Sequence, residues 1–192
     1  MRIDRKLNFV IPVETGDGTE VYVHATPIGA EVFRRYHLVI AKTFAMIHQE
    51  GLGAIAAPRV AAEMLREVAR SMDETGARLA DVEQGLLAEV SRLSNVLRPG
   101  PSGWEMVPLS EAIKDGTISP EDANEVENAL AFFTVSSAMH RRAVLEPVLR
   151  GAAMLWGGRV ESLSCAEFSR SLPTLTATER SGATAPTSSV PS

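Results

Sequence analysis

The densest apolar face of the chain lies within residues 118–145. Ser119 is a suitable N-cap, and Pro120 stands at the first helical position, where its missing N–H costs no hydrogen bond. Acidic residues follow in the first turn, where they complement the helix dipole. The residues that then recur at the helical period are Val126, Ala129, Leu130, Phe133, Ser137, His140 and Val144. We therefore predict a central helix in this segment, with Pro147 bending the chain after it.

A second apolar stripe runs along the same predicted helix and consists of Phe132, Val135 and Met139. Two stripes require two sets of neighbours. One hypothesis is that the second stripe is a protein-binding surface for an apolar partner helix or for a second copy of the chain, since Met and Phe suit such surfaces. The alternative is that Trp156 and residues 86–97 cover it within the monomer.

Near the N-terminus the apolar pattern changes to strict alternation. Residues 7–13 and 19–25 alternate on either side of Gly16-Asp17-Gly18, which predicts a β-hairpin. A two-residue loop would pair Val13 with Tyr22, whereas a three-residue loop with Gly18 in the left-handed region pairs Val13 with Val21. Because the second register collects the apolar side chains on one face, we predict the three-residue loop. It also places Pro12 opposite Tyr22 on the outer face, close to a free strand edge.

Further amphipathic patterns predict helices at residues 27–50, 58–73 and 77–97, and shorter ones at 109–114 and 148–156, with a short extended piece at 104–107. After Glu161 the chain is rich in Ser, Thr, Ala and Pro and loses its periodicity, and only a weak pattern for a residual helical turn remains at residues 165–171. The predicted fold class is mainly α (α+β). A single domain at residues 1–160 would hold the N-terminal hairpin (residues 7–25) and a bundle of about five helices, followed by a disordered tail at residues 161–192.

Composition narrows the classes of partner. The formal net charge of −5 argues against nucleic acid, because binding to phosphates depends on Lys and Arg. No run approaches the roughly 20 apolar residues that span a bilayer, and the first ten residues lack the apolar core of a signal peptide. We expect no membrane partner, and a protein that stays in the cytoplasm where it is made.

The sequence contains few candidate residues for catalysis or metal binding. Cys165 is the only cysteine, so one chain can form neither a disulfide nor a thiolate metal cluster. His37 and His48 lie about 16 Å apart along a predicted helix and cannot share a metal ion. His140 falls on the apolar face of the central helix, where a structural role is commoner than catalysis. With no metal-binding or nucleophile motif in the sequence, we predict no enzyme activity, no cofactor and no metal.

Two stretches resemble a known family: LNFVIPVETGDGTEVYVHATPIGAEVF at residues 7–33 and GWEMVPLSEAIKDGTISPEDANEVENALAFFTV at residues 103–135. Together with the acidic helical body and the Ser/Thr/Pro-rich tail, they are similar to the tail assembly chaperones of long-tailed bacteriophages. The resemblance implies a protein of the host cytoplasm that binds the tape measure protein and helps to recruit tail tube subunits without entering the virion. It carries over no catalytic or ligand-binding residue.

Two other classes fit the same composition. A structural or accessory virion assembly protein would differ by remaining in purified particles. A helical regulatory or enzymatic domain would require a basic groove or a convergent polar pocket, which the sequence does not indicate. Self-association as a homo-oligomer is compatible with all three classes.

Overall fold

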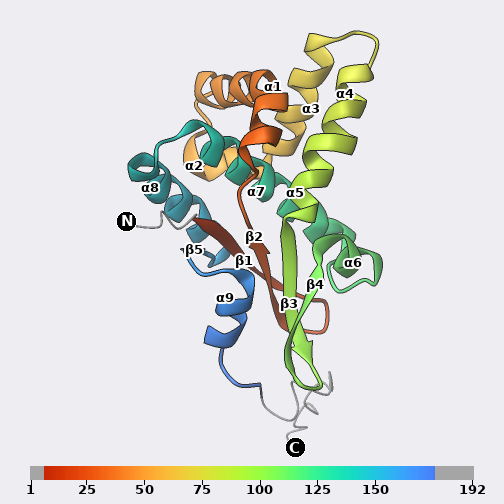
Figure 1. Cartoon of the computed structure of the whole chain (residues 1–192), viewed down its shortest axis with the longest axis vertical. Coiled ribbons are helices and arrows are strands. Elements are labelled where there is room, and N and C mark those ends of the chain that lie inside the picture. The colour runs from red at the N-terminus through yellow and green to blue at the C-terminus, as the bar shows by residue number, and fades with distance from the viewer. Residues whose placement is uncertain (1–6, 176–192) are drawn as a thin grey trace, which may run out of the picture.

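The computed structural model describes residues 7–175 and shows a helical layer packed on one antiparallel sheet (Figure 1). The first half of the chain contains β1 (Asn8–Glu14), β2 (Glu20–Ala25), α1 (Ala30–Gln49), α2 (Gly53–Ala56), the 3-10 turn η1 (Ala57–Arg59), α3 (Ala61–Met72), α4 (Ala77–Asp81), the π-helical η2 (Val82–Leu87) and α5 (Ala88–Arg92). The second half contains β3 (Ser94–Gly100), β4 (Gly103–Pro108), α6 (Leu109–Lys114), α7 (Pro120–Met139), α8 (Arg142–Ala153), the 3-10 turn η3 (Met154–Trp156), β5 (Arg159–Glu161) and α9 (Cys165–Ser171).

The predicted hairpin is confirmed in register and in loop length. Val13 pairs with Val21 and Pro12 with Tyr22. The N–H of Thr15 donates to the carbonyl of Thr19 at 2.8 Å, which leaves three residues in the loop. Gly18 has φ +80°, a conformation that glycine adopts without steric cost. The apolar face of this hairpin belongs to the main hydrophobic core, as the alternation predicts.

The predicted fold class is wrong, because strands are spread through the chain. The sheet has the order β4-β3-β2-β1-β5, so the N-terminal hairpin lies inside it rather than standing alone. The helix expected to reach residue 97 ends at Arg92, and the next residues form β3, in which Val96 and Leu97 are both fully buried. A strand buried on both faces reads as a continuous apolar run, and periodicity cannot distinguish such a run from a helix.

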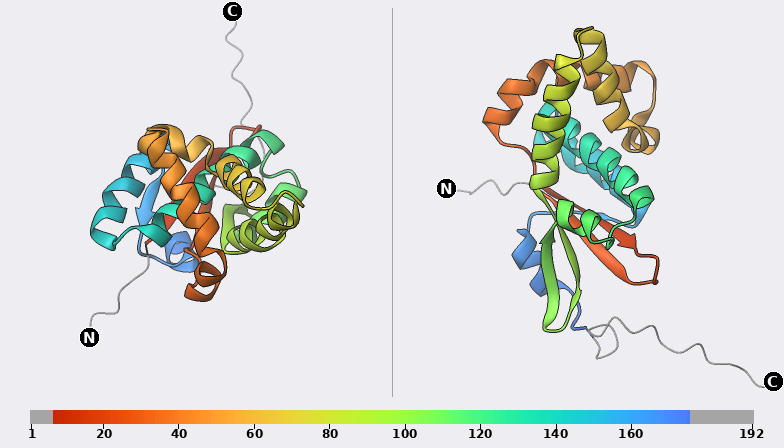
Figure 2. Two further views of the ribbon diagram at one scale, coloured as in Figure 1. Left: turned by 90° about the horizontal axis from the view of Figure 1, so that it is seen from above. Right: turned by 90° about the vertical axis from the view of Figure 1, so that its right-hand side faces the viewer.

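The tail boundary predicted at Glu161 is also wrong for the part of the tail that the structure describes. β5 pairs with the first three residues of β1, and α9 begins with a capping box formed by Ser164 and Glu167. Phe168 of α9 is fully buried against Val10 and Leu97, on the face of the sheet opposite α7. Figure 2 shows α9 and α7 on opposite sides of the strands. The rest of the predicted tail, residues 176–192, lies outside the described residues.

α7 is the central helix, as predicted, and begins as predicted: the Ser119 hydroxyl accepts a hydrogen bond from the N–H of Asp122 at 3.1 Å. It ends at Met139 rather than at residue 145, because His140 takes an extended conformation. α8 then includes Pro147 instead of starting after it. Helices α1, α3 and α8 and strand β1 all pack on α7, and residues 128–136 are buried on every side.

None of the helices in residues 7–175 is long and apolar enough to cross a membrane.

Candidate functional site

A pocket of about 330 Å³ opens where the C-terminal ends of α1 and α7 meet α2 and α8. Its size falls in the range of small ligand or side-chain pockets. The lining is mainly apolar, with two imidazoles and one hydroxyl, and consists of Phe44, Ile47, His48, Gly51, Gly53, Phe132, Ser136, His140 and Val148. The pocket is therefore built from two parts of the chain that are far apart in the sequence, residues 44–53 and 132–148.

Three aromatic rings gather at this pocket. The ring centroid of Phe44 lies 4.2 Å from that of His48 and 4.9 Å from that of His140. The two imidazole centroids are 6.4 Å apart. His48 and Phe44 are one helical turn apart on α1, whereas His140 follows the last turn of α7. The packing of α1 on α7 thus creates a histidine pair that the sequence separates by more than ninety residues.

The backbone fixes the orientation of both imidazoles. Nδ1 of His48 is 2.9 Å from the carbonyl oxygen of Phe44, and Nδ1 of His140 is 3.1 Å from the carbonyl oxygen of Ser136. A carbonyl oxygen can only accept, so each Nδ1 donates in this geometry. The structural role predicted for His140 accounts for its Nδ1 but does not account for its place in the pocket wall.

The predicted binding stripe does not form one exposed surface. Phe132 is 4% exposed and lines the pocket, and Val135 is fully buried in the main core. Met139 is 37% exposed at the end of α7. The stripe is divided because α7 is surrounded by neighbours along most of its length, and the packing that covers Val135 ends before Met139.

Exposed apolar side chains occur on the elements around the pocket. Val144 lies one turn before the pocket residue Val148 on α8 and is 51% exposed. Ile55, on the neighbouring helix α2, is 71% exposed. Together with Met139, these residues define what we call the rim: Ile55, Met139 and Val144. Each of the three lies on a helix that contributes a lining residue to the pocket.

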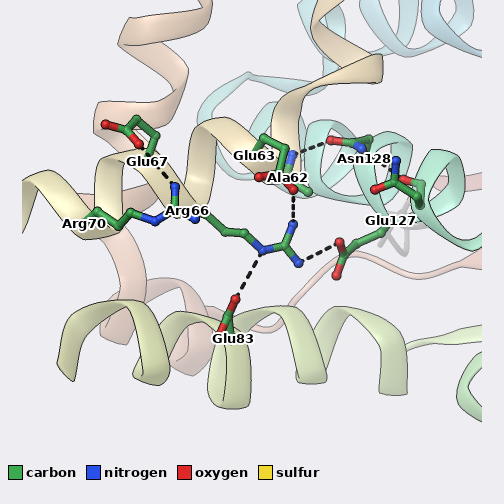
Figure 3. A network of polar contacts seen from close by, with 9 residues as sticks. Ala62, Glu63, Arg66, Glu67, Arg70, Glu83, Glu127 and Asn128 are labelled. Carbon is green, nitrogen blue, oxygen red and sulfur yellow. Dashed lines mark hydrogen bonds and ion pairs between the residues drawn. The ribbon is translucent and has the colours of Figure 1, made fainter. Parts of the chain in front are cut away.

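A network around Arg66 holds the opposite end of the helical layer together (Figure 3). The Arg66 guanidinium reaches Glu63 on its own helix at 2.8 Å, Glu83 on η2 at 3.4 Å and Glu127 on α7 at 2.7 Å. Beside it, Oδ1 of Asn128 accepts a hydrogen bond from the N–H of Ala62 at 3.0 Å. These contacts connect three helices, and the carboxylates are engaged by the guanidinium, so we assign the network to structure.

Two buried polar side chains, Asn8 and His24, contact the segment that leads into α9. The carbonyl oxygen of Leu163 accepts from Nδ2 of Asn8 at 2.7 Å and is 3.1 Å from Nε2 of His24. Among the described residues, Oδ1 of Asn8 and Nδ1 of His24 have no hydrogen-bond partner. Burial lowers the pKa of His24, because the charged imidazolium would lose its hydration. This pair anchors the segment that leads into α9.

The remaining candidate groups are dispersed. Burial raises the pKa of the Cys165 thiol to about 11, so little of the reactive thiolate is present at neutral pH. Within residues 7–175, no group of three or more His, Cys, Asp or Glu side chains is placed to hold a metal ion. Phe44 and His48 are site residues that the sequence did not predict. Their spacing of one helical turn can be read from the sequence, but their approach to His140 cannot.

The comparisons with known proteins add no family or relative: no family model, no curated protein and no solved structure matches this chain.

Proposed function

We propose that this chain is a tail assembly chaperone of a long-tailed bacteriophage, acting in the host cytoplasm by binding the tape measure protein and helping to recruit tail tube subunits. The observation that carries the proposal is the apolar pocket with its exposed rim. A chaperone of this kind must hold apolar helical segments of another protein before they are assembled. The pocket offers a place for one apolar side chain, and the rim offers contacts for its neighbours.

The pocket replaces the stripe as the proposed binding surface. Phe132 forms part of its wall and Met139 part of its rim, while Val135 supports α7 from within the core. An apolar side chain of a partner helix that enters the pocket would contact Phe44 and Phe132. Side chains one turn away on that helix would then meet Met139 and Val144, following the helix-in-groove mode of recognition.

Co-purification of the chain with apolar segments of the tape measure protein tests the proposal. The double variant Met139→Glu/Val144→Lys changes two exposed side chains and should leave the melting temperature close to wild type. We expect it to weaken capture at least tenfold. Leu38→Lys is the matched control, since Leu38 is an exposed apolar residue on α1 that does not line the pocket. Undiminished capture by the double variant, or equal loss in the control, contradicts the proposed surface.

A measurement on finished particles separates the proposal from its main alternative. A chaperone is absent from purified virions, whereas a structural or accessory virion assembly protein remains in them. Quantitative mass spectrometry of purified particles decides between these two functions. Adding tail tube subunits to the captured complex tests recruitment, which we expect to depend on the tape measure protein being bound.

A further inference from the structure

His48 and His140 both line the pocket, and their imidazole rings lie near each other. In each residue Nδ1 donates to the carbonyl oxygen one turn earlier, so Nε2 carries the free lone pair. Metal-binding histidines commonly show this arrangement, in which the second ring nitrogen donates to a backbone carbonyl and thereby fixes the tautomer. The two rings come from different helices, and their centroids are 6.4 Å apart.

We propose that this pair binds one divalent transition-metal ion of the class that prefers imidazole, such as Ni²⁺, Cu²⁺ or Zn²⁺. Two imidazoles that share one ion at metal–nitrogen distances of about 2.0–2.1 Å and bond angles of about 90–120° have ring centres about 4.5–5.5 Å apart. The ring centres, now 6.4 Å apart, must therefore approach each other by about 1–2 Å. His48 is exposed and can make this adjustment by a small rotation of its side chain.

The pocket determines which ions fit. Of the described residues that line it, none is Asp or Glu, so it lacks the oxygen ligands that Mg²⁺ and Ca²⁺ require. Imidazole nitrogen instead suits the later transition metals. The described chain supplies two ligands, and water fills the other coordination positions, for which the pocket volume of about 330 Å³ leaves room. This inference is independent of the proposed function and concerns the protein without any partner.

The test is isothermal titration of the full, untagged chain with NiCl₂ at pH 7.5. We expect one saturable site that His48→Ala and His140→Ala each weaken by at least about tenfold, as loss of one of two ligands requires. His37→Ala is the matched control: His37 lies on the same helix, and its Nδ1 is 2.9 Å from the carbonyl oxygen of Arg34, but it is exposed and outside the pocket. The control should bind Ni²⁺ like the wild type.

Thermal melting supplies a second readout. A hundredfold excess of ZnCl₂ over the wild-type dissociation constant should raise the melting temperature of the wild type by roughly 5–10 °C and that of His48→Ala by no more than about half as much. His48 is exposed, so this variant should fold normally even if His140→Ala does not. The proposal is overturned by the absence of saturable Ni²⁺ binding in the wild type. Unchanged affinity in a folded His48→Ala chain, or equal weakening by His37→Ala, overturns it as well.

Discussion

The ring of Phe9 on β1 stacks on the ring of Phe133 on α7, with centroids 5.4 Å apart and planes inclined by 12°. Both side chains are buried, and they join the inner face of the sheet to the central helix. The contact fixes the position of α7 relative to β1. Because Phe133 lies between the pocket residues Phe132 and Ser136 on α7, this contact also supports the pocket wall.

Phe133→Ala should lower the free energy of unfolding by about 3–5 kcal/mol, because it removes a buried ring and leaves a cavity beside Phe9. Urea denaturation measures the effect. Leu38→Ala, at an exposed apolar position, should change stability by no more than about 0.5 kcal/mol. A loss of less than about 1 kcal/mol in Phe133→Ala would show that the stacked pair does not hold the two layers together.

Deleting the chain after Glu161 should lower the melting temperature by roughly 10 °C, because it removes Phe168 and exposes Val10 and Leu97. Deletion after Leu175 is the matched control, since it retains α9 with the contacts of Phe168. Differential scanning calorimetry of both chains checks the expectation. Equal melting temperatures for the two truncated chains would mean that α9 contributes nothing to folding.

Gly18→Ala should destabilise the protein by about 1–2 kcal/mol. Gly18 has φ +80°, and in this left-handed conformation a Cβ lies too close to the following carbonyl oxygen. Gly16→Ala in the same loop is the matched control. The φ of Gly16 is not positive, and an added Cβ would meet no described atom within 4 Å. Chemical denaturation should find the control neutral or slightly more stable. Equal losses from both variants would reject the left-handed role of Gly18.

Gly85→Ala should destabilise the protein, although alanine is the better helix former by about 1 kcal/mol. A Cβ at Gly85 would come within 1.8 Å of the Tyr36 hydroxyl, which donates to the carbonyl oxygen of Asp81 at 3.2 Å. Introducing Tyr36→Phe removes that hydroxyl, so the loss caused by Gly85→Ala should be smaller in the Tyr36→Phe background. A double-mutant cycle measures this coupling, and strict additivity would contradict it.

Stability should fall as the pH decreases below about 6.5, because burial holds the pKa of His24 in the folded chain below its ordinary value of 6.5. As the pH decreases, His24 is therefore protonated in the unfolded chain before it is protonated in the folded chain. The stability that neutral His24 contributes is fully present above pH 6.5 and is lost as the pH decreases through the pKa of His24 in the folded chain. His24→Gln should flatten this pH dependence, whereas His37→Gln, at an exposed position, should preserve it. An identical pH dependence in His24→Gln would assign the effect to another group.

Local sequence signals determined the parts of the fold that depend on neighbouring residues. The hairpin register followed from matching apolar side chains across a short loop, and the start of α7 followed from Ser119 and Pro120. Both depend on interactions between residues that are close together in the sequence, so the sequence alone predicts them. The helix predicted at residues 27–50 also forms, as α1 at Ala30–Gln49, because an amphipathic helix on a core shows its period in the sequence.

Only the tertiary structure decided which apolar runs became strands. Leu97 fits a helical spacing, but β2 offers backbone partners on one side of β3 and β4 on the other. Phe168 lies in a segment of weak periodicity, and it is ordered by the outer face of the sheet rather than by its own neighbours. The pocket also depends on tertiary packing. Its two histidines approach each other because α1 packs on α7, and a contact between such distant segments cannot be predicted from a local sequence pattern.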